Sequence, residues 1–274
     1  MKTLELNNGI SIPILGLGTY KIGRTEEDVY RAVRNGIEIG YRHIDTATLY
    51  LNEKPVGKAI RESGIAREEI FVTTKLWGSD ILNNRIQETF EGSLKNLGLD
   101  YIDMYLIHWP VKGMVSSSWG EMENIYQSGR TKAIGVSNHL NHHLEEILKN
   151  SSIIPVVNQM ELHPYLIQED VVEYCKNNNI IPEAWSPLGS SKVPLLKEDL
   201  LINIGHKYGK SSAQVVLRWN IQKSIISIPK SSNKERQKEN FDIFDFELTH
   251  EEINQIDSLN KNHRIGAHPD HIEF

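Results

Sequence analysis

The chain has 274 residues, of which 39% are hydrophobic and 24% are charged. This balance is typical of a globular protein with a sizeable core. The formal net charge of -6 and the pI near 6.0 argue against a nucleic-acid or anionic-membrane partner, because both require clustered positive charge. We therefore expect a small-molecule partner, no nucleic-acid partner and no membrane partner.

The sequence shows no signal for export from the cytoplasm or for insertion into a membrane. The N-terminal residues show no apolar signal-peptide run, and no apolar stretch reaches the ~18 residues that span a bilayer. Cys175 is the only cysteine, so no intrachain disulfide can form, and a reducing cytoplasm is the simplest location. We expect a cytoplasmic protein that is a monomer.

Near the N-terminus, two runs of alternating hydrophobic and polar residues flank Asn8-Gly9. Asn-Gly is favoured in type I′ turns because both residues tolerate positive φ. We predict a β-hairpin with a type I′ turn, and we expect it to cover one end of the fold.

The rest of the chain alternates short apolar runs, rich in β-branched residues, with amphipathic segments. The apolar runs predict strands at residues 13–19, 41–47, 70–76, 101–108, 132–138, 155–161, 180–186 and 224–230. Thr25 begins a capping pattern for a helix that we expect to end at Gly36, and a second helix is expected to end at Gly98. Residues 249–261 predict a further helix, which is followed by a polar tail.

Eight strands alternating with helices over roughly 250 residues are typical of a (β/α)8 barrel. No Pro/Ser-rich linker divides the chain, so we predict a single α/β domain over residues 1–274. It is a TIM barrel with an N-terminal hairpin cap and an additional C-terminal helix and tail. A Rossmann fold is the alternative, but Lys21 stands where its phosphate-binding pattern requires a third glycine. Gly16 and Gly18 are better explained by the first strand turning out of the barrel.

In a barrel of this kind the active site lies at the C-terminal ends of the strands. Polar or aromatic residues follow seven of the predicted strands at this end: Asp45, Tyr50, Lys75, His108, Ser137, Asn138, Gln159, Trp185, Ser186, Lys230 and Ser231. Burying an unpaired lysine or aspartate is costly, so packing alone does not explain these residues. We expect them to form one site.

Three separated motifs carry a resemblance to a known family. They are the stretch 40–57, which contains Asp45, Tyr50 and Glu53, and the stretches 122–139 and 228–243. On these motifs the chain resembles an aldo-keto reductase over essentially its whole length. It departs at His139, where the family usually has phenylalanine or tyrosine.

The resemblance implies that Asp45, Tyr50, Lys75 and His108 form a catalytic tetrad. Reduction of an aldehyde needs a hydride for the carbon, which the cofactor supplies, and a proton for the oxygen. A phenol has a pKa near ~10, and a neighbouring ammonium lowers that pKa. We expect Tyr50 to be the general acid, Lys75 to lower its pKa, and Asp45 to hold Lys75 charged. His108 is expected to donate a hydrogen bond to the substrate oxygen.

The resemblance also implies an NADPH/NADP site. Its expected residues are Thr19, Tyr20, Ser137, Asn138, Gln159, Trp185, Ser186, Leu188, Lys230, Ser231, Arg236, Glu239 and Asn240. The group at 137, 138 and 159 is expected to bind the carboxamide, and Trp185 to stack on the nicotinamide. Residues 186–189 match the pyrophosphate loop. The ammonium of Lys230, the hydroxyl of Ser231 and the guanidinium of Arg236 suit a 2′-phosphate. Residues 239 and 240 match the family's adenine contacts.

Tyr20, Trp77 and Trp109 follow strand ends and are expected to line an apolar substrate pocket, with the C-terminal tail as another wall. The expected function is NADPH-dependent reduction of aldehydes, including α-dicarbonyls such as glyoxal or methylglyoxal. One alternative is an NADPH-binding, redox-sensing barrel with little turnover. Another is a metal-dependent hydrolase, but the strand ends lack its clustered histidines and carboxylates. His139, His142 and His143 have spacing compatible with a helix but no nearby carboxylate or cysteine in a metal-ligand pattern, so we expect no metal site.

Overall fold

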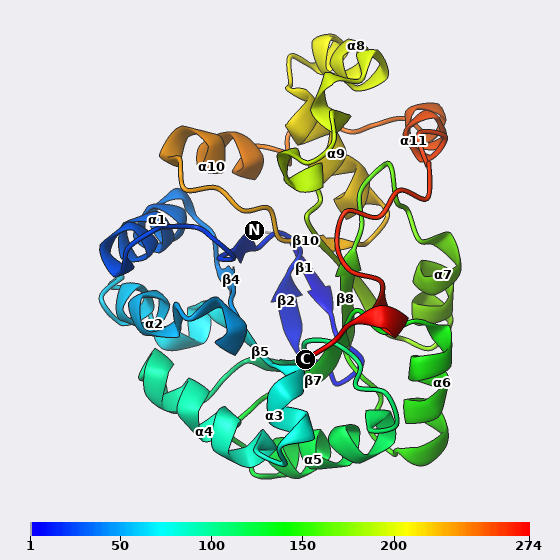
Figure 1. The fold of residues 1–274 in the computed structure, drawn as a ribbon. Helices are drawn as coiled ribbons and strands as arrows, with labels where there is room; N and C mark the ends of the chain where they lie inside the picture. Colours follow the sequence, from blue (N-terminus) through cyan, green and yellow to red (C-terminus); the bar gives the residue numbers. More distant parts are fainter. Residues whose placement is uncertain (1) are drawn as a thin grey trace.

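The computed structural model describes residues 2–274 and shows a ring of helices around a central parallel barrel (Figure 1). The barrel strands are β3 (Leu17–Gly18), β4 (His43–Asp45), β5 (Phe71–Leu76), β6 (Met104–Ile107), β7 (Ile134–Ser137), β8 (Val157–Glu161), β9 (Ile181–Trp185) and β10 (Ile226–Ser227). They pair in chain order from β3 to β10. The N–H of Gly16 donates to Ser227 O over 2.8 Å and closes the ring. The predicted (β/α)8 barrel is confirmed.

Gly16 and Gly18 have a different structural reason from the one that we expected. A Cβ on Gly18 would lie 2.8 Å from the carbonyl oxygen of Ile228, and a Cβ on Gly16 would lie 2.7 Å from His43 Nδ1 and 2.9 Å from the Ile228 side chain. Gly18 therefore lets β3 approach the segment after β10 closely where the barrel closes, and Gly16 also makes room for the His43 ring of β4.

Helices follow each barrel strand and form the outer layer. They are α1 (Glu26–Ile39), α2 (Glu53–Arg61), α3 (Gly78–Leu82), α4 (Ile86–Leu97), α5 (Val115–Gln127), α6 (Asn141–Asn150), α7 (Glu169–Asn177), α8 (Asp199–Tyr208), α9 (Ser212–Gln222), α10 (Lys234–Phe241) and α11 (His250–Asp257). Short 3-10 turns are η1 (Thr48–Tyr50), η2 (Arg67–Glu69), η3 (Gly189–Ser191), η4 (Leu195–Lys197) and η5 (Pro269–His271). No helix within residues 2–274 has the length and hydropathy needed to cross a bilayer.

The helix boundaries follow local chemistry, with one correction. Thr25 caps α1 as predicted, because its hydroxyl accepts from the N–H of Asp28. The helix ends at Gly40, which has φ 124°, and the predicted end at Gly36 is wrong. A Cβ on Gly36 would lie 2.6 Å from Leu17, so that glycine serves helix–strand packing. Gly98 ends α4 in the left-handed region, as predicted.

The predicted hairpin is present as β1 (Thr3–Glu5) and β2 (Ser11–Pro13). Its turn differs from the prediction, because Gly9 has φ 82° whereas Asn8 does not have a positive φ. A type I′ turn needs both. Asn7 donates to Pro155 O over 3.1 Å and Asn8 to Lys132 O over 3.1 Å, just before two barrel strands begin. The hairpin therefore covers the N-terminal end of the barrel.

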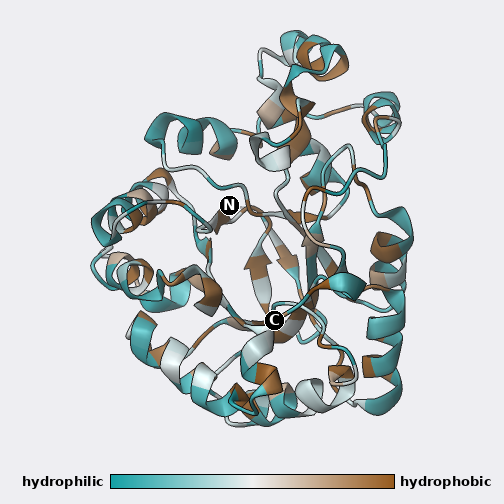
Figure 2. Ribbon diagram, viewed as in Figure 1, coloured by the Kyte–Doolittle hydropathy of each residue, from teal (hydrophilic) through white to brown (hydrophobic). Residues whose placement is uncertain are grey.

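The barrel interior changes from apolar to polar along its axis. Leu6 and Ile12 of the hairpin pack with Phe71, Met104 and Val157 at the covered end. In Figure 2, hydrophobic residues colour much of β1 and β2 at the centre of the ring, whereas the outer helix α10 is hydrophilic. Polar inward side chains follow toward the other end. The fold thus leaves one end open and lined by groups that can do chemistry.

Candidate active site at the open end of the barrel

Strand alternation decides which side chains enter the barrel. In β5, Phe71 joins the interior cluster, Thr73 contacts His43, and Lys75 reaches Asp45. These side chains share one face because they lie two residues apart. Tyr50 ends η1, which is held to β5 by a bond of 2.9 Å from the Thr48 hydroxyl to the backbone oxygen of Lys75.

Lys75 lies at the centre of the polar cluster and is fully buried. Its Nζ donates to Asp45 Oδ1 over 2.6 Å and to Thr46 O over 2.8 Å. The Tyr50 hydroxyl oxygen lies 3.5 Å from the same nitrogen. The structure therefore brings together three residues that the sequence placed at the ends of two strands.

The charges in this cluster depend on one another. Burial opposes the charge on Lys75, but Asp45 and then Tyr50 favour it, so the net effect raises the pKa of Lys75. For Asp45, burial raises the pKa, and the ion pair with Lys75 opposes that rise. Its other oxygen, Oδ2, accepts from Gln159 Nε2 over 2.8 Å. The carboxylate and the ammonium thus stabilise each other inside the barrel.

We expected Lys75 to lower the pKa of Tyr50. Lys75 does act in that direction, but the net pKa of Tyr50 is raised. Burial is the largest influence and raises the pKa of the phenol to about 12. The nearby Lys75 charge lowers it, but by less than burial raises it. The hydroxyl is therefore protonated at neutral pH, and the ammonium stabilises the phenolate whenever one forms.

His108 follows β6 directly and is 7% exposed. Burial, and then the charge of Lys75, hold its pKa well below 6.5, so its ring is neutral. Its Nδ1 is buried without a hydrogen-bond partner in the described part of the chain. An unpartnered N–H is costly there, so the proton is favoured on Nε2. The ring lies edge-on to Tyr50, with centroids 5.7 Å apart.

Glu183 is a member of the cluster that the sequence analysis missed. It is fully buried on β9, and its Oε1 accepts from Gln159 Nε2 over 3.1 Å. Burial, and then the charge of Asp45, raise the pKa of Glu183 to about 8. Its position two residues before Trp185 was the available signal, because alternation turns both side chains to one face.

Ser137, Asn138 and Gln159, which we expect at the carboxamide, use some of their hydrogen-bonding groups within the protein and leave others unused. Asn138 Nδ2 donates to His108 O and to Ser137 Oγ, over 2.9 and 3.0 Å. Gln159 Nε2 donates to Asp45 and Glu183, so the hydrogens of both amides are used. What remains is the Ser137 hydroxyl as a donor, the amide oxygen of Gln159, and the second lone pair of Asn138 Oδ1, whose first lone pair accepts from Trp185. That set is complementary to a carboxamide, which offers one acceptor and two donors.

Trp185 and His139 flank this group. The Trp185 Nε1–H donates to Asn138 Oδ1 over 2.8 Å, which fixes the orientation of the half-buried indole. His139 is 1% exposed, and its Nδ1 lies 2.8 Å from Ser137 O. The ring thus occupies the place of the family's usual aromatic residue and supports the backbone of Ser137. Thr19 is fully buried, and its hydroxyl has no partner within residues 2–274.

The residues expected at the phosphates and the adenine lie in three places: before and within the first turn of α10, at the far end of α10, and in the turn after β9. Lys230 and Arg236 are exposed, and among the described residues neither has a carboxylate within ion-pair distance. Ser231 is 8% exposed and accepts from the N–H of Asn233, the residue that caps α10. Glu239 and Asn240, at the far end of α10, are half-buried and buried. Ser186 and Leu188 are half-buried in the turn after β9.

Aromatic rings form a continuous row along the rim of the open end. Tyr20 lies 5.0 Å from Tyr50, and Trp77 lies 5.3 Å from His108, measured between ring centroids. Phe274, which the sequence analysis did not name, extends the row from the C-terminal tail. Its ring centroid lies 5.3 Å from that of Trp77. Trp109 is only 8% exposed, so little of its ring faces the opening.

Two surface cavities lie outside this cluster. One of about 890 Å³ borders the N-terminal hairpin, and one of about 760 Å³ lies between the loop at Lys21 and the start of α10. Neither is lined by Asp45, Tyr50, Lys75 or His108. The titratable groups locate the candidate site more clearly than the size of a cavity does.

Comparisons with known proteins agree with this fold and site. The sequence profile described as "Aldo/keto reductase family" matches residues 14–261. The 9,11-endoperoxide prostaglandin H2 reductase of Trypanosoma cruzi is 50% identical, covering 98% of this chain and 95% of that protein. The glyoxal reductase of Bacillus subtilis is 47% identical, covering 99% and 98%.

A solved structure extends the comparison to three dimensions. The crystal structure of Bombyx mori aldo-keto reductase in complex with NADP has a TM-score of 0.92 to this chain at 39% identity, covering 98% of this chain and 96% of that one. The family profile spans most of the chain, and the similar proteins match almost its full length. The chain therefore belongs to the aldo/keto reductase family and is an oxidoreductase that acts on carbonyl groups.

Proposed function

We propose that this protein reduces aldehydes, including α-dicarbonyls such as glyoxal and methylglyoxal, with NADPH as the reductant and Tyr50 as the general acid. The observation that carries the proposal is the position of Lys75. Its buried ammonium contacts Asp45 and lies 3.5 Å from the Tyr50 hydroxyl, at the open end of the barrel.

The proposed proton transfer uses groups of this chain. A bound NADPH supplies the hydride to the carbonyl carbon. Tyr50 gives its hydroxyl proton to the carbonyl oxygen, and Lys75 stabilises the resulting phenolate. Asp45 keeps Lys75 charged at 2.6 Å. The neutral His108 donates a hydrogen bond from Nε2, which stabilises negative charge developing on the oxygen.

Support for a nicotinamide cofactor comes from the remaining hydrogen-bond capacity. The Ser137 hydroxyl would donate to the carboxamide oxygen, and the oxygens of Asn138 and Gln159 would accept from its nitrogen. Trp185, oriented by its bond to Asn138, offers a ring face for stacking. The Bombyx mori enzyme, whose structure contains NADP, has the same fold.

The preference for NADPH follows from α10. Lys230 and Arg236 supply an ammonium and a planar guanidinium, and Ser231 lies beside the helix cap. A 2′-phosphate has the charge and geometry for such a set, and the N-terminus of a helix also favours an anion. NADH lacks that phosphate, so these contacts would distinguish the two cofactors.

The proposed substrate class rests on the rim and on one relative. Tyr20 is 49% exposed and Phe274 is 36% exposed, so apolar rings are available to a substrate. The glyoxal reductase of Bacillus subtilis supports small dicarbonyls. The prostaglandin reductase of Trypanosoma cruzi is similarly related and is named for a much larger substrate. Identity alone therefore does not select the substrate.

The direct test follows the loss of NADPH absorbance with a panel that contains glyoxal, methylglyoxal and simple alkyl and aryl aldehydes. NADH is run in parallel. We expect turnover with NADPH and much slower turnover with NADH. Tight NADPH binding without reduction of any member would contradict the proposal and favour the redox-sensing barrel.

A further inference from the structure

The C-terminal tail runs over the open end of the barrel (Figure 1). It is bonded to the rest of the protein at separate points. One attachment is Glu161 at the end of β8, which is fully buried. The two oxygens of this carboxylate accept from the backbone N–H groups of Ile265 and Gly266, over 2.7 and 2.8 Å. This attachment holds the start of the tail beside Trp185.

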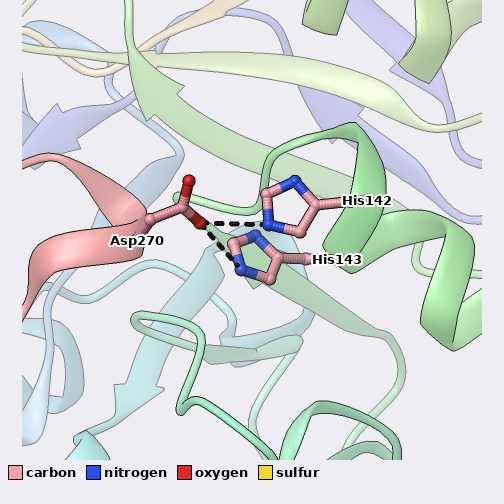
Figure 3. Close-up of side chains that lie close together, drawn as sticks. All are labelled: His142, His143 and Asp270. Carbon is pink, nitrogen blue, oxygen red and sulfur yellow. Dashed lines mark hydrogen bonds and ion pairs between the residues drawn. The ribbon is translucent and has the colours of Figure 1, made fainter.

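The second attachment joins the tail to α6. Asp270 Oδ1 lies 3.0 Å from His142 Nε2 and 3.3 Å from His143 Nε2. Figure 3 shows both imidazole rings directed at the same carboxylate oxygen. Asp270 lies 128 positions from His142 in the chain, so no local sequence pattern joins this carboxylate to the two histidines.

The hydrogen bonds of His143 identify its proton. Its Nδ1 accepts from the N–H of Leu140 over 3.1 Å, at the start of α6. A neutral ring that accepts at Nδ1 carries its hydrogen on Nε2, which faces Asp270. Burial, and then the charge of His142, lower the pKa of His143 to about 4, so the ring is neutral. His143 thus caps the helix with one nitrogen and donates to the tail with the other.

This arrangement favours a hydrogen-bonded attachment over a metal site. A metal would need the lone pair of His143 Nε2, and a metal-bound histidine normally donates a hydrogen from its other nitrogen. Here that other nitrogen is an acceptor for Leu140. Metal binding would therefore break the helix cap.

Beyond Asp270, the tail ends against the rim. The ring of Phe274 meets Trp77 edge-on, with centroids 5.3 Å apart, and Trp77 meets His108 in the same way. A Cβ on Gly78 would lie 2.1 Å from the Phe274 ring, so this glycine makes the room that the ring occupies. The rings of Trp77 and His108 therefore lie between Phe274 and Tyr50.

We propose that Asp270, held by His142 and His143, is a positioning residue that places Phe274 as a specificity-determining wall of the substrate pocket. The proposal rests on the proposed carbonyl reduction at Tyr50. It assigns to Phe274 the recognition of aryl or other bulky apolar aldehydes. Glyoxal is too small to need that wall, so the attachment changes the choice among substrates and leaves the chemical step unchanged.

The test compares kcat/KM for 4-nitrobenzaldehyde with kcat/KM for glyoxal. Asp270→Ala should lower that ratio roughly threefold to tenfold, as loss of an aromatic contact does, mainly through KM for the aryl substrate. Phe274→Ala should lower it equally, and the double variant should be no worse than Phe274→Ala. Asp270→Asn keeps an oxygen that both histidines can donate to, so it should restore the wild-type ratio.

Hydrogen exchange of the amides in residues 266–274 provides a readout that needs no activity. It should become roughly tenfold faster in Asp270→Ala, because the tail opens locally. His271→Ala, in the same exposed turn, is the matched control and should leave both readouts unchanged. Unchanged exchange in Asp270→Ala overturns the attachment, and faster exchange with an unchanged substrate ratio overturns the specificity role.

Two further outcomes are distinguishable. If Zn²⁺ alone slows tail exchange in the wild type and not in His142→Ala, the cluster binds metal and the hydrogen-bonded attachment is overturned. If the wild type reduces no carbonyl compound, the proposed function and the specificity role both fail. The exchange data would then still decide whether Asp270 attaches the tail.

Discussion

Lys75 Nζ donates to Asp45 Oδ1 over 2.6 Å inside the barrel, where the two side chains are 0% and 2% exposed. A buried pair of this kind is sensitive to the loss of one partner, because the remaining charge has no water to solvate it. Each partner therefore holds the other in its charged form at the base of the candidate site.

This relationship predicts a strong coupling in stability. Asp45→Asn or Lys75→Met alone should lower the free energy of unfolding by about 3–5 kcal/mol, because each leaves one unpaired buried charge. The double variant should lose much less than the sum of the two. Urea unfolding at pH 7 measures all four proteins, and additive losses would show that the pair is not coupled.

Removing the Tyr50 hydroxyl tests the general acid. Tyr50→Phe should lower kcat for aldehyde reduction by about 10²–10⁴-fold, the usual contribution of a positioned acid, and should leave the Kd for NADPH nearly unchanged. Tyr174→Phe is the control, because Tyr174 lies on the outer helix α7 and its hydroxyl has no part in the site. Wild-type kcat in Tyr50→Phe, in an assay limited by chemistry, would assign the proton to another group.

Arg236 tests the cofactor preference. Arg236→Ala should raise the Kd for NADPH by about 10- to 100-fold, since it removes hydrogen bonds to a charged phosphate, and should change the Kd for NADH little. Lys238→Ala is the control, because Lys238 is exposed on the same helix and pairs with Glu235. Fluorescence titration gives the Kd of the wild type and of both variants for each cofactor. Equal losses for both cofactors would remove Arg236 from the 2′-phosphate site.

Gly266 tests the packing of the tail against Trp185, the residue that we propose stacks on the nicotinamide. A Cβ there would lie 2.5 Å from the Trp185 ring and 2.8 Å from Glu161 Oε2. Gly266→Ala should therefore displace Trp185 or the tail and weaken NADPH and NADH by a similar factor, roughly threefold or more for one lost aromatic contact. A Cβ on Gly120 meets no atom within 4 Å, so Gly120→Ala should bind both cofactors normally. Normal binding by Gly266→Ala would show that Trp185 does not hold the cofactor.

Glu183 predicts a pH-dependent contribution to stability. Burial raises its pKa from 4.5 to about 8, so between these values the folded protein holds a proton that the unfolded chain has released. Stability is therefore lost as pH rises through this window. Glu183→Gln avoids the loss and should gain at most about 5 kcal/mol over the wild type at pH 8.5, with little gain at pH 4.5. Urea unfolding at pH 4.5 and at pH 8.5 measures the two gains in stability. An equal gain at both pH values would show that the titration of Glu183 is not the cause.

Several features could be predicted because short stretches of sequence carry them. Thr25 caps its helix through a residue only three positions away, and β5 alternates its side chains so that Lys75 must face inward with Thr73. Turn geometry was less accessible. Asn8-Gly9 was read as a type I′ turn, yet only Gly9 has positive φ, and the turn is closed by bonds from Gly9 N–H to Leu6 O and from Leu6 N–H to Ile10 O.

Gly36 shows the same limit at a helix end. A glycine is a common helix terminator, so the local pattern favoured an end there. The helix continues to Ile39. Gly36 lies inside it, at the point where the Leu17 side chain packs closely against α1. A glycine that serves packing and a glycine that serves as a cap look alike in sequence.

The sequence by itself determined the order of strands and helices, the inward face of each strand, and the candidate residues at the strand ends, since all of these follow from periods of a few residues. Only the tertiary structure decided which of these residues meet, how deeply they are buried, and therefore how their pKa values shift. Glu183 approaches Gln159, Asp270 reaches His143, and Tyr50 becomes a weaker acid on burial. Such outcomes depend on contacts and desolvation between segments far apart in the chain, which no local pattern records.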